Sequence, residues 1–363
     1  MALYNLSAEQ SVLGSILIEP ESILVANQFN LGVDDFFHPQ HQILYNCIKK
    51  MDSQDMIKLA NEVKATVLDS PCVDDLFVDA SDISLDTTPS PSIETGFAPL
   101  DAATSGGLNF GTLTVLTGSP GSGKSTFLNQ ILANALSLGF NSFLYSGELT
   151  AQMALDWFYK TVANPIHLSF GVNSFGKTIK VTDEGVLQIN KWLKNKLFLF
   201  SKNAQADETN ISTVIEFLAV KKDVKLFVLD NLMTIECSGS DKYEKQINVI
   251  KSLKNLAKHY NIVIILVAHS NKNSIMRREP HVFDISGASE IANLSDYILN
   301  ATRDNDVENE TTILLLKNRI TGLIKKHLQL KFSPDRKRFY TDSKLELERD
   351  YGYGEVYEQE SFC

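Results

Sequence analysis

The sequence predicts an α/β protein in which a mostly parallel sheet, covered by helices, follows a small all-α domain. Three observations support this fold class. Up to residue 68, apolar residues recur only at helical spacing. From Thr95 onward, short β-branched runs alternate with amphipathic stretches, and strands that are connected through helices form parallel sheets. A glycine-rich segment, finally, joins one of these runs to a helix.

The chain begins with a helical domain over residues 1–68, which opens on the capping box Ser7–Gln10. An acidic linker follows over residues 69–95. Within it, residues 73–80 are typical of a short helix, which either docks on a neighbouring subunit or packs on its own domain. The α/β domain is expected over residues 96–341.

Residues 118–125, Gly-Ser-Pro-Gly-Ser-Gly-Lys-Ser, fit the pattern G-x-x-x-x-G-K-[ST] without a mismatch. They follow the β-branched run 112–117 and lead into the helical pattern 127–136, the order that a phosphate-binding loop requires. Glycines let backbone N–H groups converge on phosphates, and the new helix presents the positive end of its dipole. We therefore expect ATP to bind at Gly118, Ser119, Pro120, Gly121, Ser122, Gly123, Lys124, Ser125 and Thr126, with Lys124 on the β- and γ-phosphates and Ser125 on Mg²⁺.

Three predicted strands end in Glu148, Asp230 and His269, and ligands of open α/β sheets lie at the carboxyl ends of the strands. Asp230 follows the run Leu-Phe-Val-Leu and is expected to hold Mg²⁺ together with Ser125. We expect Glu148 to polarise the water that attacks the γ-phosphate. His269 is expected to hydrogen-bond the γ-phosphate and a neighbouring loop at once. Helix capping by Glu148 and a purely structural His269 are the alternatives.

Two further groups of cations follow. Lys317 and Arg319 come after the predicted strand 311–316, with no carboxylate close by in sequence, and we expect them to reach the phosphate site of a neighbouring subunit. Arg319 would then be a finger supplied in trans, and a surface cation is the alternative. Lys272, Arg277 and Arg278 stand against a single glutamate in the segment after His269. They are the candidates for contact with a single-stranded DNA backbone, unless that segment is simply solvated.

Composition narrows the class of protein. A chain of 363 residues with 44% hydrophobic and 21% charged residues is typical of a globular protein. No apolar run reaches the roughly 18 residues of a membrane span and no signal pattern begins the chain, so we expect no membrane partner and a cytoplasmic location. The net charge of −10 argues against coating nucleic acid with the whole surface, but it leaves room for a local basic channel. The four scattered cysteines do not indicate a zinc knuckle.

With these residues in view, the chain resembles the DnaB family of replicative ring helicases, whose ATPase domain has a RecA-like P-loop fold. The resemblance covers nearly the whole length, and the ATPase domain is similar to the phage and mitochondrial, Twinkle-like branch. The motifs that carry it are Leu6–Gly14, Asp34–Phe37, Thr95–Asp101, Leu229–Leu232, Val267–Ser270, Asp284–Ala288 and Lys317–Gly322.

The resemblance also implies roles for individual residues. Arg303 and Phe332 would contact and stack on the nucleobase. Ser286 stands where bacterial relatives carry an arginine that contacts DNA, so the expected contact shifts to backbone amides near Gly287 and to the basic segment. The amino-terminal domain looks truncated, which puts a standard collar and a standard primase contact in doubt. The acidic, aromatic tail over residues 342–363 is similar to tails with which replisome proteins bind partners, and plain disorder is the alternative.

We therefore expect an ATP hydrolase, with Mg²⁺ as its metal, that forms a ring, most simply a hexamer. It would translocate on single-stranded DNA, 5′ to 3′ by the resemblance, and unwind the duplex at a replication fork. Primase, polymerase or a helicase loader are candidate partners, and a bacterial cell or its phage is the expected source. The alternatives are a RecA-fold remodelling or recombination ATPase without unwinding, and a non-catalytic replisome scaffold.

Overall fold

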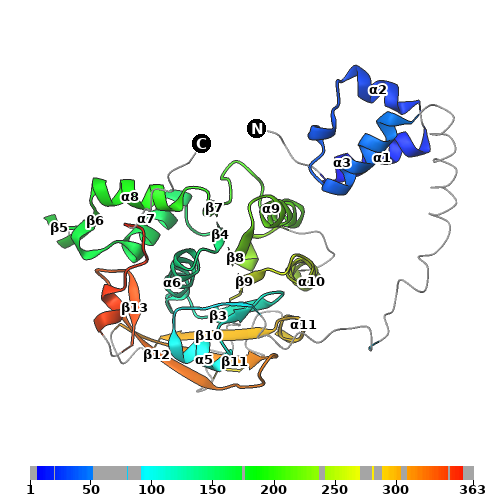
Figure 1. Ribbon diagram of the computed structural model, residues 1–363. Coiled ribbons are helices and arrows are strands. Elements are labelled where there is room, and N and C mark those ends of the chain that lie inside the picture. The colour runs from blue at the N-terminus through cyan, green and yellow to red at the C-terminus, as the bar shows by residue number, and fades with distance from the viewer. Residues whose placement is uncertain are drawn as a thin grey trace. The chain divides into compact units, whose positions relative to one another are not determined.

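The computed structural model describes residues 6–19, 21–51, 80, 91–173, 176–236, 242–269, 280–281, 288–303, 309–341 and 344–354. The chain divides into two compact units, residues 1–89 and residues 90–363 (Figure 1). Among the described residues, no helix combines the length and the apolar character that a bilayer span requires.

The first unit is helical over its described residues, as predicted. Its helices are α1 (Leu6–Ile18), α2 (Ser22–Gln28) and α3 (Pro39–Lys50). They enclose a small apolar cluster that includes Leu13, Phe36 and Tyr45. The buried Glu9 accepts the backbone N–H of Phe37 at 2.6 Å, which ties the segment before α3 to α1. Residues 52–68 of the predicted helical domain and residues 73–79 of the predicted short helix lie outside the described residues.

The second unit is built on a nine-stranded sheet. Across the sheet the strands are β13 (Arg338–Tyr340), β12 (Lys326–Ser333), β11 (Glu310–Asn318), β10 (Tyr297–Arg303), β3 (Leu113–Gly118), β9 (Val263–Val267), β8 (Val224–Asp230), β4 (Asn141–Ser146) and β7 (Leu197–Leu199). Pairing is parallel from β10 through β7 and antiparallel from β10 through β13. The mostly parallel sheet predicted from the sequence is thus confirmed.

Helices cover both faces of this sheet (Figure 1). One face carries α5 (Ala98–Ala103), α6 (Lys124–Ser137), α7 (Ala151–Val162) and α8 (Asp183–Leu193), and the other carries α9 (Glu208–Lys221), α10 (Lys242–Tyr260) and α11 (Ala288–Leu294). The central strands are apolar on both sides for this reason. Along β8, Leu226 and Val228 face the first layer, while Phe227 and Leu229 face the second.

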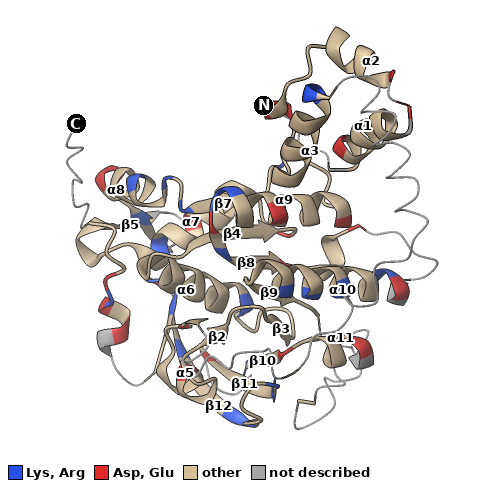
Figure 2. Ribbon diagram, turned by 45° about the vertical axis from the view of Figure 1, so that its right-hand side comes forward, with Lys and Arg blue, Asp and Glu red and all other residues tan. Residues whose placement is uncertain are grey.

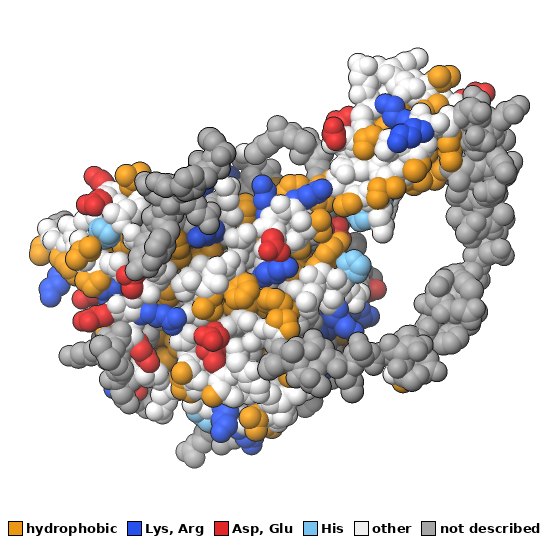
Figure 3. Space-filling model, in the orientation of Figure 1, with side chains coloured by type: hydrophobic (Ala, Val, Ile, Leu, Met, Phe, Trp, Pro, Cys, Tyr) orange, Lys and Arg blue, Asp and Glu red, His pale blue; other side chains and the backbone are white. Residues whose placement is uncertain are grey.

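Two small sheets complete the unit. Strand β1 (Ser92–Ile93) pairs with β2 (Leu108–Asn109), and β5 (Leu168–Asn173) forms a hairpin with β6 (Gly176–Val181). The outer part of the hairpin exposes apolar side chains, Phe170 by 66% and Val172 by 82%, and Figure 3 shows hydrophobic side chains gathered at this end of the molecule. Figure 2 shows both Lys and acidic residues on α8, whereas α10 carries mainly lysines.

The edges of the α/β domain differ from the expected residues 96–341. Strand β1 begins at Ser92, inside the predicted linker. At the other end, Tyr351 and Tyr353 of the predicted tail are only 3% and 0% exposed. Burial of Arg338, which donates to the carbonyls of Leu347 and Arg349 at 2.9 Å, lowers its pKa to about 10. The predicted tail is therefore corrected over residues 344–354, which belong to the α/β domain. The acidic residues around Tyr351 and Tyr353 suggested an exposed segment, but both tyrosine rings are buried. Residues 355–363 lie outside the described residues.

Candidate nucleotide-binding and catalytic site

The glycine-rich loop connects the buried strand β3 to α6, which begins at Lys124. Two glycines fix its path. Gly118 has φ +145°, and a Cβ there would strike the carbonyl oxygen of Ala301 on β10. Gly123 has φ +88°, and a Cβ there would strike the ring of Phe339. A side chain at either position would thus displace a neighbouring strand as well as strain the backbone.

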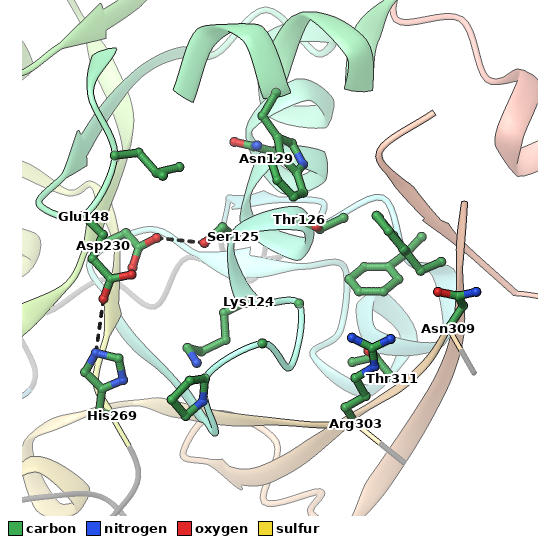
Figure 4. A pocket seen from close by; sticks show the side chains of 17 residues that line it. Lys124, Ser125, Thr126, Asn129, Glu148, Asp230, His269, Arg303, Asn309 and Thr311 are labelled. Carbon is green, nitrogen blue, oxygen red and sulfur yellow. Dashed lines mark hydrogen bonds and ion pairs between the residues drawn. The ribbon is translucent and has the colours of Figure 1, made fainter. Parts of the chain in front are cut away.

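A pocket of about 470 Å³ lies over this loop. It brings together eleven of the predicted site residues, which are Pro120, Gly121, Gly123, Lys124, Ser125, Thr126, Glu148, Asp230, His269, Arg303 and Phe332. Figure 4 shows Glu148, Asp230 and His269 on one side of the loop and Arg303 on the other. Gly118, Ser119 and Ser122 belong to the loop without lining the pocket. Lys272, Arg277, Arg278, Ser286 and Gly287 lie outside the described residues, so their contacts stay predictions.

The pair expected to hold Mg²⁺ is in contact. Ser125 Oγ donates to Oδ2 of Asp230 at 3.1 Å. Burial raises the pKa of Asp230, with Glu148 acting in the same direction and the Ser125 hydrogen bond opposing it. A hydroxyl beside a buried carboxylate is a hard-oxygen donor set of the kind that Mg²⁺ prefers. The residues present therefore fit a magnesium ion.

Lys124 is folded over the loop. Its Nζ donates to the carbonyl oxygens of Gly118 at 2.9 Å and Ser119 at 2.8 Å. Burial lowers the pKa of Lys124, while the negative charges of Asp230 and Glu148 oppose that shift. A positive charge held at the centre of the loop suits a polyphosphate.

Glu148, Asn231 and His269 form a network at the ends of β4, β8 and β9. The Nδ2 atom of Asn231 lies 2.5 Å from Oε1 of Glu148 and 3.1 Å from Nε2 of His269. Nε2 of His269 lies 3.3 Å from the same Glu148 oxygen, the contact drawn in Figure 4. The sequence predicted roles for the carboxylate and the imidazole but none for Asn231. Asn231 stands within the family motif Leu229–Leu232, directly after Asp230, and that motif was the signal that could have indicated it.

The far end of the pocket is aromatic. Trp157 of α7, Phe332 of β12 and Phe339 of β13 line it. The ammonium of Lys337 lies 4.7 Å from the centre of the Trp157 ring and 5.7 Å from that of Phe332, so one cation contacts both rings. Several lining residues could not be predicted from the sequence, because α6, α7, β11 and β13 meet only in the fold. These are Asn129, Leu149, Trp157, Asn309, Thr311 and Phe339.

Lys317 and Arg319 lie outside the pocket of their own chain, and both have partners. Lys317 donates to the carbonyls of Ala292 at 2.5 Å and Ser295 at 2.8 Å, at the end of α11. Arg319 lies 3.4 Å from Asp296. The sequence showed no neutralising carboxylate nearby, but the fold supplies one. Lys317 stabilises a helix end of its own chain, and the roles of Lys317 and Arg319 at a neighbouring subunit stay predictions.

A glycine loop between a buried strand and a helix, with a Ser–Asp pair at the carboxyl ends of a parallel sheet, defines a P-loop nucleotide-binding protein with a RecA-like fold. Comparison with protein-family models identifies the family. The DnaB-like helicase C terminal domain matches residues 92–341, and the DnaB-like helicase N terminal domain matches residues 1–69. The chain belongs to the DnaB-like helicase family.

Two curated proteins are similar to parts of the chain. A probable replicative DNA helicase of Trieres chinensis is 25% identical over 270 residues, which cover 68% of this chain and 57% of the relative. The DNA repair protein RadA of Escherichia coli is 26% identical over 198 residues, covering 53% of this chain and 34% of RadA. The chain thus spans just over half of the first relative and about a third of the second.

Solved structures share the fold. A structure described as an ATPase domain superposes with a TM-score of 0.57 at 17% identity, covering 69% of this chain and 90% of that domain. A DnaB-like replicative helicase, described together with its interactions with primase, superposes with a TM-score of 0.59 at 16% identity. That match covers 92% of this chain and 99% of the other. It extends the likeness to both predicted domains.

Proposed function

We propose that this protein is an ATP-driven replicative DNA helicase, which translocates on single-stranded DNA as a ring and separates the duplex ahead of it. The observation that carries the proposal is the convergence of Ser125, Asp230, Glu148 and His269 on one pocket, in a chain whose two domains match the DnaB-like family. A non-catalytic scaffold would have no need of this set of residues.

Each side chain has a task in ATP hydrolysis. Ser125 and Asp230 would hold Mg²⁺, which supplies charge neutralisation for the β- and γ-phosphates. Lys124 would turn its ammonium from the loop carbonyls toward the same phosphate oxygens. Glu148, with a half-exposed carboxylate, would orient the attacking water and accept its proton. His269 would donate a hydrogen bond to the terminal phosphate.

The aromatic end of the pocket would hold the nucleobase. Phe332 offers a ring face for stacking, and Arg303 lines the same pocket. Trp157, which the sequence did not suggest, would close this end from α7. Adenine of ATP would thus lie between residues of β10, β12 and α7, with its phosphates over the loop.

Subunits of the ring, six by the family resemblance, would complete the site. Arg319 is half exposed at the end of β11, where it could reach the nucleotide of a neighbouring copy and stabilise transition-state charge. Lys272, Arg277, Arg278 and the amides near Ser286 and Gly287 would contact the DNA backbone. Primase, polymerase or a helicase loader would be further partners. The protein would act on replicating DNA in the cytoplasm.

The test is unwinding of a forked DNA duplex with ATP and Mg²⁺ by the full chain, Glu148→Gln and Glu184→Gln. Glu184 is an exposed residue of α8 and serves as the control. We expect unwinding by the full chain and the control, and a loss of about a hundredfold or more in Glu148→Gln. Equal activity in all three would remove the assignment of Glu148.

The same assay addresses a second candidate function. The match to RadA leaves open a DNA-remodelling ATPase of the same fold. ATP turnover stimulated by single-stranded DNA, without unwinding of any fork by the full chain, would favour that function over a helicase.

A further inference from the structure

Asn129 is a buried amide of the nucleotide pocket. It lies on α6, lines the pocket and is 8% exposed. Among the described residues, its side chain has no hydrogen-bond partner. Buried amides in folded proteins are nearly always hydrogen-bonded, because their withdrawal from water is otherwise unfavourable. An unpaired amide in the wall of a ligand pocket is therefore suited to contact the ligand.

The place of Asn129 on α6 is beyond the phosphate site. Asn129 follows Ser125 by four residues, so the two side chains lie on the same face of the helix, about 6 Å apart along its axis. Figure 4 shows Ser125 and Thr126 between Lys124 and Asn129. When the phosphates of a nucleotide lie over the loop, Asn129 is thus left to contact the nucleoside.

Trp157 has a second unpaired polar group on the same side of the pocket. It lies on α7, which is in contact with α6, and its Nε1 is buried without a hydrogen-bond partner in the described part of the chain. Asn309, a further amide of the lining, is only half-buried, so water can serve as its partner. The buried hydrogen-bonding capacity at the aromatic end of the pocket therefore lies on α6 and α7.

We propose that Asn129 hydrogen-bonds the N6–N7 edge of the bound adenine and so selects ATP over GTP. The inference deepens the proposed function, because it rests on the placement of the nucleobase at the aromatic end of the pocket. In an extended nucleotide the N7 side of the purine lies nearer to the 5′-phosphates than the N1 side does. A residue one helical turn beyond Ser125 therefore meets the N7 side first.

The amide matches adenine at this edge and does not match guanine. Adenine presents the N6 amino donor beside the N7 acceptor, and the Asn129 carboxamide supplies the acceptor Oδ1 and the donor Nδ2. Guanine presents O6 beside N7, so the amide oxygen would face a second oxygen. We therefore expect the dissociation constant for GTP to exceed that for ATP about tenfold or more.

The experiment measures dissociation constants by displacement of a fluorescent nucleotide with ATP, GTP and 7-deaza-ATP, which lacks the N7 acceptor. The proteins are the full chain, Asn129→Ala, Asn129→Asp and the matched control Asn309→Ala. We expect 7-deaza-ATP to bind the full chain and the control about fivefold or more weakly than ATP. In Asn129→Ala and Asn129→Asp, which both lack the amide donor, the two nucleotides should bind within about twofold of each other.

A merely structural role of Asn129 would weaken all three nucleotides alike and leave their ratios unchanged. Such unchanged ratios, equal binding of ATP and 7-deaza-ATP by the full chain, or loss of the preference in Asn309→Ala instead, would each overturn the inference and leave the proposed function standing. Absence of fork unwinding by a full chain that shows the expected base preference would overturn the helicase function alone.

Discussion

Arg319 Nη1 lies 3.4 Å from Oδ1 of Asp296, and the backbone N–H of Arg319 donates to the carbonyl of Asp296 at 2.9 Å. Asp296 itself is buried and also forms an ion pair with Lys254 of α10. The arginine expected to act on a neighbouring subunit is therefore held at its base by the core of its own subunit. Its side chain stays 48% exposed, which leaves the guanidinium accessible to a second copy.

This arrangement predicts a dominant effect when subunits are mixed. Each Arg319→Ala subunit would disable the nucleotide site of a wild-type neighbour, a loss of roughly 10³-fold or more per affected site. ATP turnover of mixtures should thus fall faster than the fraction of wild-type chains. Lys325→Ala, at an exposed position of the same turn, is the control. A strictly proportional decrease with Arg319→Ala would show that the arginine does not act in trans.

Asp296 predicts a stability effect that is separate from activity. Oδ2 of Asp296 accepts the backbone N–H of Leu113 at 2.8 Å and contacts Lys254. Asp296→Ala leaves a poorly exposed lysine without its carboxylate, which should cost about 3–5 kcal/mol in the free energy of unfolding. Asp156→Ala, which removes an exposed i,i+4 pair with Lys160, should cost less than about 1 kcal/mol. Urea titrations of the two variants check this, and equal losses would contradict the central role of Asp296.

We expect the buried carboxylate of Asp230 to lower the stability of the fold at neutral pH while it supports Mg²⁺ binding. Burial is the main cause that raises its pKa above the ordinary 3.8, so the unfolded chain ionises Asp230 at lower pH than the folded chain does. The resulting penalty on the fold is absent at low pH, grows as the pH rises from 3.8 through the raised value, and is complete above it. Asn at this position can keep a partner for Ser125 without the charge.

We therefore expect Asp230→Asn to be more stable than the unmodified chain at pH 7, by about 1 kcal/mol, and to lose Mg²⁺-dependent nucleotide binding. The stability difference should shrink as the pH approaches 4. Thermal unfolding at both pH values is the measurement. A variant that is less stable at pH 7 would mean that the ionised carboxylate supports the fold.

Phe332 tests the nucleobase end of the pocket. Phe332→Leu keeps apolar volume but removes the aromatic face, and loss of one stacking contact should raise the dissociation constant for ATP about tenfold. Phe170→Leu, on the exposed hairpin and outside the pocket lining, is the matched control. Fluorescence titration with a labelled nucleotide compares them. Unchanged affinity in both variants would place the base elsewhere.

The segment after residue 341 is predicted to be required for folding. A chain that ends at residue 341 loses Tyr351 and Tyr353 and leaves the buried guanidinium of Arg338 without the carbonyls of Leu347 and Arg349. The free energy of unfolding should fall by about 3 kcal/mol or more. A chain that ends at Gly354 keeps these contacts and is the control. Equal urea midpoints for the two chains would show that residues 344–354 do not contribute to the stability of the domain.

Much of the fold was predictable because it depends on local periodicity. Apolar runs with a β-branched character marked the central strands, and the strand, loop and helix around Lys124 lie contiguously in the sequence. The motif residues at three strand ends could be brought together by one rule, that parallel strands point their carboxyl ends to the same edge. Arg303 and Phe332 came from the family resemblance, and the pocket includes both.

Contacts between distant segments could not be predicted in this way. The ammonium of Lys337 contacts the rings of both Trp157 and Phe332, because α7 packs against the end of β12. No local sequence pattern predicts this packing. Asp296 neutralises Arg319 across 23 positions of sequence, and the tyrosines at 351 and 353 are buried although acidic residues surround them. Each of these depends on which surfaces meet when helices and strands pack.

The sequence by itself determined the phosphate loop, the alternation that requires a parallel sheet, and the identity of the side chains at its strand ends. Only the tertiary structure decided that Asn231 joins Glu148 to His269, that Lys317 serves its own helix, and that the domain continues to residue 354. The physical reason is the range of the interactions. Backbone conformation and periodicity act over a few residues, whereas burial and hydrogen-bond pairing depend on partners that only the folded chain brings within reach.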